Sequence, residues 1–286
     1  MWAVFGGSGF EKFDSFKRID EIEIDTPFGK PSAPILRAAV NGIEVLFLSR
    51  HGKHHEYSPS HINYRANVFA AKKCGASKIL SLSAVGSLQK ELKPGDCVVP
   101  TQYLDRTKTR EHTFCVKGVV GHVSLAHPVD LELVAHTKEI LKPEGFTIHY
   151  DKTYICMEGP AFSTKAESKM YRLLGADIVG MTNFPEYALA KEAGLYYLPL
   201  SFVTDYDCWD DALEHVTLEQ VLEVMRKNNQ KAYTLMEQLF PATKDLFLKG
   251  CPEQGLKTGL MTPLASLSDD IQDWMSVLCA ASQKRD

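Results

Sequence analysis

Residues 196–207 read YYLPLSFVTDYD, an apolar run that ends in two acidic residues separated by one tyrosine. The pattern predicts a buried strand from Tyr196 to Phe202, followed by a polar end. Side chains alternate across an extended chain, so Asp205 and Asp207 are expected on the same side. Two carboxylates directed into one pocket are costly unless a proton or a partner stabilises them, which favours a functional site over a helix cap or a turn.

Four other apolar runs also end in small or polar residues. They end near positions 5, 49, 83 and 180, where the sequence continues as GGSG, RHG, AVGS and MTN. Helical patterns alternate with these runs, which predicts an α/β fold. Ligand sites in α/β sheets gather at the carboxyl ends of strands. We therefore expect the five strand ends to build one pocket.

The 286 residues contain no internal repeat, low-complexity tract or linker, so we expect a single domain, 1–286, with a helical tail at about 245–286. A net charge of −4 argues against a general nucleic-acid binder. The start of the chain has neither a basic segment nor an apolar segment of the kind found in signal peptides or membrane anchors, which predicts a cytoplasmic protein. Seven scattered cysteines without a CxxC pair predict free thiols and no metal site.

Two motifs after predicted strands suit an anion. Residues 6–9, GGSG, allow close backbone approach to a phosphate, although a tight turn would use the same residues. The dinucleotide-binding fingerprint would need a glycine where Lys12 stands, which disfavours an oxidoreductase. Residues 50–55, RHGKHH, offer the planar fork of Arg50 to phosphate oxygens, or else form a solvated surface loop.

Two further segments suit a flat, partly apolar ligand. Residues 158–163, EGPAFS, would set an aromatic ring and a hydroxyl beside a base, although a phenylalanine is more often part of the core. Thr217 and Gln220 form a capping pattern before a long helix. Its apolar positions recur at helical spacing and predict one buried face: 218, 222, 225, 232, 235 and 239.

Taken together, nine runs resemble the 5'-methylthioadenosine phosphorylase branch of the trimeric purine nucleoside phosphorylases. The runs stand in the family's order and cover about residues 3–240, whereas residues after about 245 match poorly. In chain order they are GGSGF (6–10), DTPFGKPS (25–32), SRHGKHH (49–55), LSAVGSL (82–88), LKPGDCVVP (92–100), EGPAFSTKAES (158–168), GADIVGMTNFPE (175–186), LAKEAG (189–194) and TDYDCW (204–209).

The resemblance implies a mixed central β-sheet flanked by helices, a homotrimer, and inorganic phosphate as cosubstrate with no metal or organic cofactor. It implies phosphorolysis of 5'-methylthioadenosine to adenine and 5-methylthioribose 1-phosphate. The implied phosphate-contacting positions are Ser8, Arg50, His51, Ser83, Ala84 and Thr182. Met181 falls against the ribose, and Phe162, Ser163, Asp205 and Asp207 face the purine. His122, Leu218, Val221 and Leu222 match the lining around the 5'-substituent, part of it supplied by a neighbouring subunit.

The chain departs from the family pattern at three positions. Ser8 and Ser83 stand where many relatives have threonine, so the hydroxyl is kept. Ala161 stands where an arginine is common, so any role of that arginine is absent.

The expected chemistry is an attack of bound phosphate on the anomeric carbon while Asp205 protonates the leaving purine. Asp207 either accepts from the 6-amino group or holds Asp205 in its proton-bearing geometry, and the two carboxyls can titrate as a pair. Two alternatives stay open. A 6-oxopurine phosphorylase acting on methylthioinosine or inosine is disfavoured by the acceptor carboxylates. A non-catalytic nucleoside-binding sensor is disfavoured by the phosphate-binding motifs.

Overall fold

The centre of the protein is a mixed sheet that partly closes on itself. The computed structural model describes residues 1–6, 16–210, 218–244, 246, 248 and 255–280, with the side chains of 218–222 left undescribed. The sheet order is β2-β3-β4-β1-β5-β8-β7-β6-β9, and β9 also pairs with β5. The strands are β1 (Trp2–Gly6), β2 (Phe16–Ile22), β3 (Ile35–Val40), β4 (Ile43–Ser49), β5 (Lys78–Ser87), β6 (Cys97–Arg106), β7 (Ile148–Met157), β8 (Ile178–Gly180) and β9 (Tyr196–Tyr206).

Both strand directions occur, so the expected mixed sheet in an α/β fold is confirmed. β1 runs parallel to β4 and β5, and β5 runs parallel to β9. The hairpin β2–β3–β4 and the pairs β5–β8 and β6–β9 are antiparallel. Because β9 joins β6 to β5, the strands β5, β8, β7, β6 and β9 form a closed ring, and the remaining four extend it on one side.

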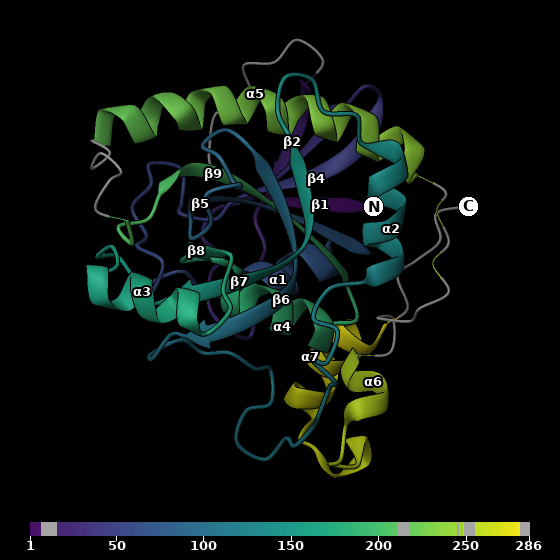
Figure 1. Cartoon of the computed structure of the whole chain (residues 1–286). Helices are drawn as coiled ribbons and strands as arrows, with labels where there is room; N and C mark the ends of the chain where they lie inside the picture. Colours follow the sequence, from purple (N-terminus) through teal and green to yellow (C-terminus); the bar gives the residue numbers. More distant parts are fainter. Residues whose placement is uncertain (7–15, 211–217, 245, 247, 249–254, 281–286) are drawn as a thin grey trace.

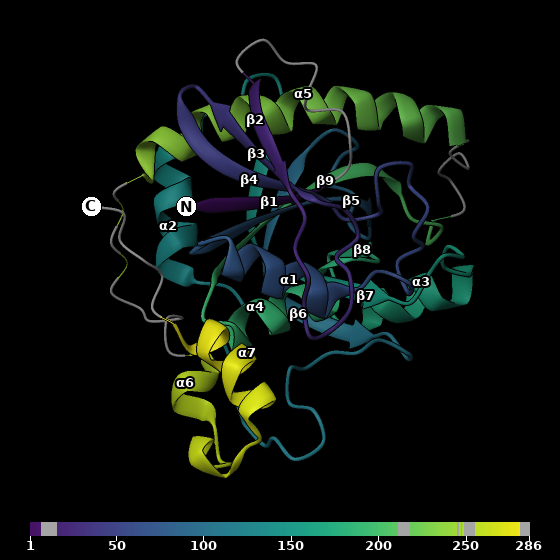
Figure 2. The same cartoon turned by 180° about the vertical axis from the view of Figure 1, so that it is seen from behind.

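Helices cover the sheet on both sides (Figures 1 and 2). The long α5 crosses one side, while α1, α3 and α4 lie on the other, and α6 and α7 pack together beside α1 and α4. No helix in the described part of the chain is long and apolar enough to cross a membrane. The helices are α1 (Tyr64–Lys73), α2 (Leu131–Ile140), α3 (Lys165–Leu173), α4 (Asn183–Glu192), α5 (Leu218–Ala242), α6 (Gly255–Gly259) and α7 (Asp269–Cys279).

The capping pattern at 164–167 forms as predicted. The Thr164 side chain accepts from the Glu167 backbone N–H, and the Glu167 carboxylate accepts from the Thr164 backbone N–H, so α3 begins with a complete capping box. Thr217 lies outside the described residues. On α5, Ala232, Leu235 and Leu239 are buried as expected.

Met225 on the same predicted face of α5 is 36% exposed, so the buried stripe is shorter than the sequence pattern indicates. The amino-terminal part of α5 extends past the strands of the sheet (Figure 1). A periodic apolar pattern predicts a face, but only the neighbouring layer decides how much of that face is covered.

Two strands run further than the sequence predicts. β5 and β9 pair in parallel from Lys78↔Tyr196 to Ser87↔Tyr206, with one irregularity after Val85. The ladder therefore continues through 84–87 and 204–206, which were expected to follow the strands as loops. Each strand supplies the backbone partners of the other, so polar side chains do not end the pairing.

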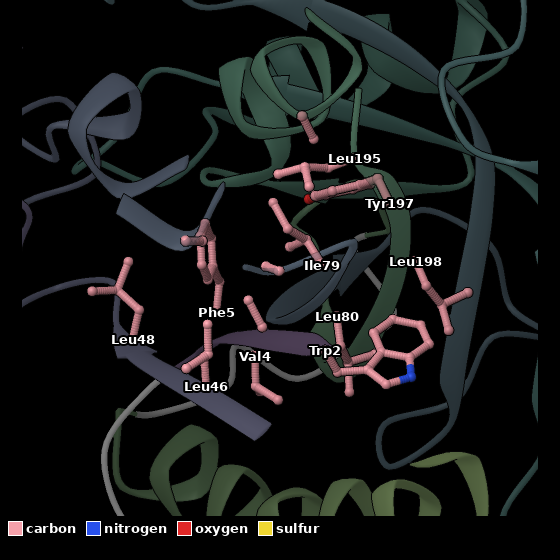
Figure 3. Close-up of a cluster of buried hydrophobic side chains, with 14 of the residues drawn as sticks. Trp2, Val4, Phe5, Leu46, Leu48, Ile79, Leu80, Leu195, Tyr197 and Leu198 are labelled. Atoms are coloured by element: carbon pink, nitrogen blue, oxygen red, sulfur yellow. The ribbon is translucent and has the colours of Figure 1, made fainter. Parts of the chain in front are cut away.

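Apolar side chains of the parallel strands form the main core (Figure 3). Val4 and Phe5 of β1, Leu46 of β4, and Ile79 and Leu80 of β5 are all at most 1% exposed. Such strands are covered on both faces, which is why they read as continuous apolar runs.

A buried ion pair ties this core to α4. Arg50 and Glu186 are 2% and 0% exposed, and Arg50 Nε and Nη2 donate to the two Glu186 carboxylate oxygens at 2.7 and 2.9 Å. The Ser81 and Tyr197 hydroxyls also donate to this carboxylate, at 2.6 and 3.0 Å. Arg50 further donates to the carbonyls of Phe5 and Leu82. The pair therefore joins the ends of β1, β4 and β5 to α4 and β9.

Glu186→Gln is expected to lower the free energy of unfolding by about 3–5 kcal/mol, because it leaves the Arg50 guanidinium buried without its counter-charge. Chemical denaturation followed by circular dichroism measures the change. Asp20→Asn is the matched control, since it breaks the exposed ion pair with Arg37 and is expected to change little. Equal effects of the two variants would contradict the structural role of the buried pair.

Candidate active site

The two acidic residues at the end of β9, Asp205 in the strand and Asp207 just after it, lie beside a glycine of β5. In the parallel ladder Gly86 pairs with Asp205. A Cβ placed on Gly86 would lie 3.6 Å from Asp205 Oδ2 and 3.4 Å from Asp207 Cβ. Both aspartates therefore face the same side of the ladder, as the alternation predicts. A larger residue at 86 would occupy the space beside the carboxylates, which glycine leaves open.

Asp205 is half-buried and has one close hydrogen-bond donor. The Thr204 hydroxyl lies 2.6 Å from Asp205 Oδ1 and is shared with the Val85 carbonyl at 3.2 Å. Burial raises the pKa of Asp205 and the nearby Asp207 charge raises it further, while the Thr204 hydroxyl lowers it; the net shift is upward. Asp205 therefore keeps a proton to a higher pH than an ordinary aspartate.

The backbone N–H of Asp207 ties this residue to the end of β5. Its N–H donates to the Ser87 carbonyl at 2.9 Å, and the indole N–H of Trp209 donates to the same carbonyl at 3.0 Å. Its Oδ2 is buried without a hydrogen-bond partner among the described residues. Burial raises the pKa of Asp207, against the lowering effect of the nearby Ser168 hydroxyl, the Cys208 backbone N–H and the Ser163 hydroxyl. An unpaired buried acceptor is suited to an outside donor.

The segment 158–163 reaches the carboxylates through Ser163. Ser163 lies close enough to influence the pKa of Asp207, and its carbonyl accepts from Cys208 Sγ at 3.2 Å. Phe162 is 78% exposed, so it is neither a core residue nor, within a single chain, packed against another group. A large aromatic ring left in solvent next to Ser163 is available to stack on a flat ligand.

The predicted phosphate positions lie further back along β5. The Ser83 hydroxyl is 3.1 Å from that of Ser201, and Ala84 is exposed. Thr182 is buried at the start of α4, and its side chain makes no capping hydrogen bond. Its hydroxyl is therefore not used by the helix that follows it.

Arg50 is more occupied than the sequence predicts. Nε, Nη1 and Nη2 all donate within the chain, to Glu186, the Phe5 and Leu82 carbonyls and Ser81. Only the second hydrogen on Nη1 has no acceptor among the described residues. The reading as a solvated surface loop is wrong for Arg50, because its side chain is 2% exposed.

His51 is fixed by the carbonyl of Tyr57, which lies 2.9 Å from its Nδ1. A carbonyl only accepts, so Nδ1 carries the hydrogen and a neutral ring presents Nε2 as an acceptor. Burial lowers the pKa of His51 to about 4, with smaller contributions of the same sign from Arg50 and His55 against the raising effect of the Tyr57 carbonyl. His51 is thus neutral at pH 7.

Not every predicted position joins this group. His122 is exposed, and its N–H donates to the carbonyl of Gly259 at 2.8 Å, which places it at the end of α6 rather than on the β5–β9 ladder. Met181 is half-buried and lies against the backbone of Gly159, where a Cβ would come within 2.5 Å of its Sδ. Ser8 and the side chains of Leu218, Val221 and Leu222 lie outside the described residues.

Sequence reasoning missed the residues that hold these groups. Glu186, Glu158 and Arg110 each contact several segments far away in the chain. The available signal for Glu186 was an acid among the small and apolar residues of α4, eight of whose ten residues are buried. An acid in such a setting is rare unless it is paired. For Arg110 no local pattern gives a comparable signal.

Comparisons with known proteins agree with the resemblance seen in the motifs. The model of the phosphorylase superfamily matches residues 2–241. The S-methyl-5'-thioadenosine phosphorylase of Prochlorococcus marinus is 43% identical over 273 residues, 94% of this chain and 87% of that protein. That of Pyrococcus abyssi is 43% identical over 250 residues, 87% of this chain and 95% of that protein.

Solved structures are equally similar. A methylthioadenosine phosphorylase from an Antarctic soil metagenomic library superposes with a TM-score of 0.90 at 38% identity, covering 97% of this chain and 98% of that one. The methylthioadenosine phosphorylase of Schistosoma mansoni in complex with adenine superposes with a TM-score of 0.79 at 32% identity, covering 98% of both chains. The family inferred from the nine runs is confirmed.

Asp207→Asn is expected to stabilise the protein at neutral pH, by roughly 1 kcal/mol, because it removes a buried charge with an unpartnered oxygen. A carboxyl whose pKa is raised on folding costs stability as pH rises through that pKa. The advantage of the variant should therefore be small near pH 4 and grow towards pH 7. Thermal unfolding across this range measures it, and a variant less stable than wild type at pH 7 would refute the assignment of the shift.

Proposed function

Because this chain belongs to the phosphorylase superfamily, we propose that it is a pentosyltransferase that splits 5'-methylthioadenosine with phosphate, giving adenine and 5-methylthioribose 1-phosphate. The observation that carries the proposal is the pair of carboxylates, Asp205 and Asp207, with raised pKa beside the open space at Gly86. Three residues back on the same strand stands Ser83. A strand rises about 3.3 Å per residue, so the two positions are about 10 Å apart, a span suited to a nucleoside with a phosphate beneath it.

In the proposed site, phosphate binds to Ser8, Arg50, His51, Ser83, Ala84 and Thr182. Two donors are the free Nη1 hydrogen of Arg50 and the hydroxyl of Thr182. The Arg50 guanidinium also places a positive charge next to the phosphate. The ion pair with Glu186 holds the guanidinium in one orientation, which removes the entropy of placing it during catalysis. Neutral His51 accepts through Nε2 from a protonated phosphate oxygen.

The proposed reaction is a displacement at the anomeric carbon. A phosphate oxygen forms a new bond to the anomeric carbon. At the same time the bond between the anomeric carbon and purine N9 breaks, and its electron pair stays on the base. Asp205 donates its proton to N7, so adenine leaves as a neutral molecule. The negative phosphate stabilises the cationic sugar that develops between the two partners.

The same carboxylates would select the base. Asp207, with an unpartnered Oδ2, accepts from the 6-amino group of adenine. The oxygen of a 6-oxo purine would face the Asp207 carboxylate, and both groups are hydrogen-bond acceptors. Mismatches of this kind discriminate between two substrates by up to about 10⁴–10⁵-fold. Met181 lies against the ribose, Ser163 joins Asp207, and the exposed ring of Phe162 covers the purine. Leu218, Val221 and Leu222 line the methylthio group.

His122 completes the pocket only if a second copy of the chain supplies it, so we propose a homotrimer. Exposed apolar residues occur in the same two segments, near His122 and near Gly259: Val120 (51%), Leu125 (39%), Met261 (69%) and Leu264 (48%). Val120 and Met261 are tied by a backbone hydrogen bond of 2.8 Å. Contiguous exposed apolar side chains mark interaction surfaces.

No organic cofactor or metal is needed in this scheme, since phosphate is the cosubstrate. We further propose that the enzyme works in the cytoplasm on small molecules, without nucleic-acid or membrane partners. The six cysteines in the described part of the chain are free thiols, which suits a reducing compartment.

The first test is adenine release from 5'-methylthioadenosine, with methylthioinosine and adenosine alongside, in the presence and absence of phosphate. We expect phosphate-dependent release that is fastest from methylthioadenosine. Faster turnover of methylthioinosine would show a 6-oxopurine phosphorylase, equal release without phosphate would show a hydrolase, and binding without turnover would show a sensor.

Asp205→Asn serves as the internal control in this assay, because it keeps the shape but cannot release a proton. It should lower kcat by about 10²–10⁴. Loss of less than threefold would remove Asp205 from the role of acid.

Light scattering is expected to give a molar mass three times that of the chain. Met261→Asp should shift the mass towards the monomer and raise KM for methylthioadenosine, since it charges the surface around His122. Lys257→Asp, on the neighbouring helix α6, is the matched control for added negative charge. A monomeric wild-type enzyme with full activity would contradict the shared pocket.

A further inference from the structure

Arg110 is a buried arginine on a loop. It lies four residues after the end of β6, in a segment without regular structure, and its side chain is 1% exposed. Charged side chains on loops normally reach solvent, since burial of a guanidinium is costly unless its donors are satisfied. The proposed chemistry gives Arg110 no task, so its burial needs another explanation.

The guanidinium donates to two separate loops at once. Nη2 donates to the carbonyls of Met157 and Glu158, at 3.3 and 2.8 Å, where β7 ends. Nη1 donates to the carbonyls of Met181, at 2.6 Å, and Phe184, where β8 passes into α4. Nη1 thus contacts two carbonyls of one loop and Nη2 two carbonyls of the other. The planar fork of arginine provides this geometry.

These two loops carry the two halves of the proposed site. The first leads from Glu158 to Phe162 and Ser163, which face the base. The second holds Met181 and Thr182, which face the ribose and the phosphate. The loops also touch directly, because Gly159 has no side chain and Met181 Sδ lies where its Cβ would be, within 2.5 Å. Arg110 therefore joins the loop that would bind the base to the loop that would bind the ribose and phosphate.

The counter-charge of Arg110 comes from the same loop that it holds. The Glu158 carboxylate lies 3.5 Å from Arg110 Nε and accepts from Ser60, from the backbone N–H groups of Lys108 and Thr109, and from the Thr109 hydroxyl. Glu158 thus anchors the loop of Arg110 to the base-side loop. The charge of the guanidinium is therefore balanced by Glu158, although Nε itself makes no hydrogen bond among the described residues.

We propose that Arg110 is a positioning residue that sets the separation of the base-side loop (157–163) from the ribose-phosphate loop (181–184). The expected effect on kcat rests on the proposed function, whereas the expected coupling of the two loops does not. Phosphate and base are bound on different loops, so each can bind after Arg110 is lost. The alignment needed for the displacement would be lost, and a misplacement of about 1 Å can cost about 10²-fold in rate.

Arg110→Lys is the critical variant, because lysine keeps the charge and much of the volume. Its ammonium is a single point and cannot bridge carbonyls of both loops in the fixed arrangement of a guanidinium. We expect kcat to fall by about 10–100-fold while KM for phosphate and for methylthioadenosine each change by less than about threefold. Arg65→Lys is the matched control, since Arg65 is also largely covered and its partners, Glu111 of the same loop and the ring of Phe28, lie outside both site loops.

Hydrogen exchange without substrates gives a readout that does not depend on activity. In Arg110→Lys, peptides covering 157–163 and 181–184 should exchange faster, while those of β2 and β3 should stay within twofold of wild type. In the wild-type enzyme, the two loops should open together, with protection factors within about threefold. The wild-type measurement stands even if the variant fails to fold.

Wild-type kcat in Arg110→Lys, equal losses in Arg65→Lys, or independent exchange of the two loops in the wild-type enzyme would each overturn the proposal. A large rise in one KM with unchanged kcat would also overturn it, because it would show a direct role in binding. If wild-type protein releases no adenine, the proposed function fails, and the exchange experiment still decides whether Arg110 couples the loops.

Discussion

The buried pair of Arg50 and Glu186 is the constraint on which the rest of the structure depends. Their side chains are separated by 136 positions in the sequence and meet at 2.7 Å with almost no exposure. A pair of this kind costs desolvation, and further hydrogen bonds to the two charged groups offset that cost. Here the carbonyls of β1 and β5 and the hydroxyls of Ser81 and Tyr197 complete it. The strand ends and α4 are consequently held in one arrangement.

That arrangement places two different kinds of polar group along one strand. Near Leu82 of β5 lies the guanidinium of Arg50, whose charge is balanced by Glu186, and near Gly86 lie two aspartates whose raised pKa values make them hold protons more firmly than ordinary carboxyls. A substrate that accepts hydrogen bonds at one end and presents an amine and a ring nitrogen at the other complements this arrangement. The ladder between β5 and β9 fixes the spacing, because it pairs the two strands on both sides of the irregularity after Val85.

Arginine serves two different purposes in the molecule. Arg50 and Arg110 are both buried, and both use the width of the guanidinium to bridge segments that are distant in sequence. Arg50 retains one hydrogen for a ligand, whereas Arg110 directs its terminal nitrogens to main-chain carbonyls and protein groups. The difference shows why residue type alone does not identify a ligand contact: the partners of each nitrogen decide it.

The sequence by itself determined the α/β class, the capping box of α3, the side on which Asp205 and Asp207 lie and, through its motifs, the family. Each of these depends on residues within a few positions of one another, where the period of a strand or helix is sufficient. Only the tertiary structure decided that Arg50 is already paired, that Phe162 is exposed, that Met225 is uncovered and that Arg110 joins two loops. Burial and pairing across long stretches of chain depend on which surfaces meet, and no local pattern encodes that.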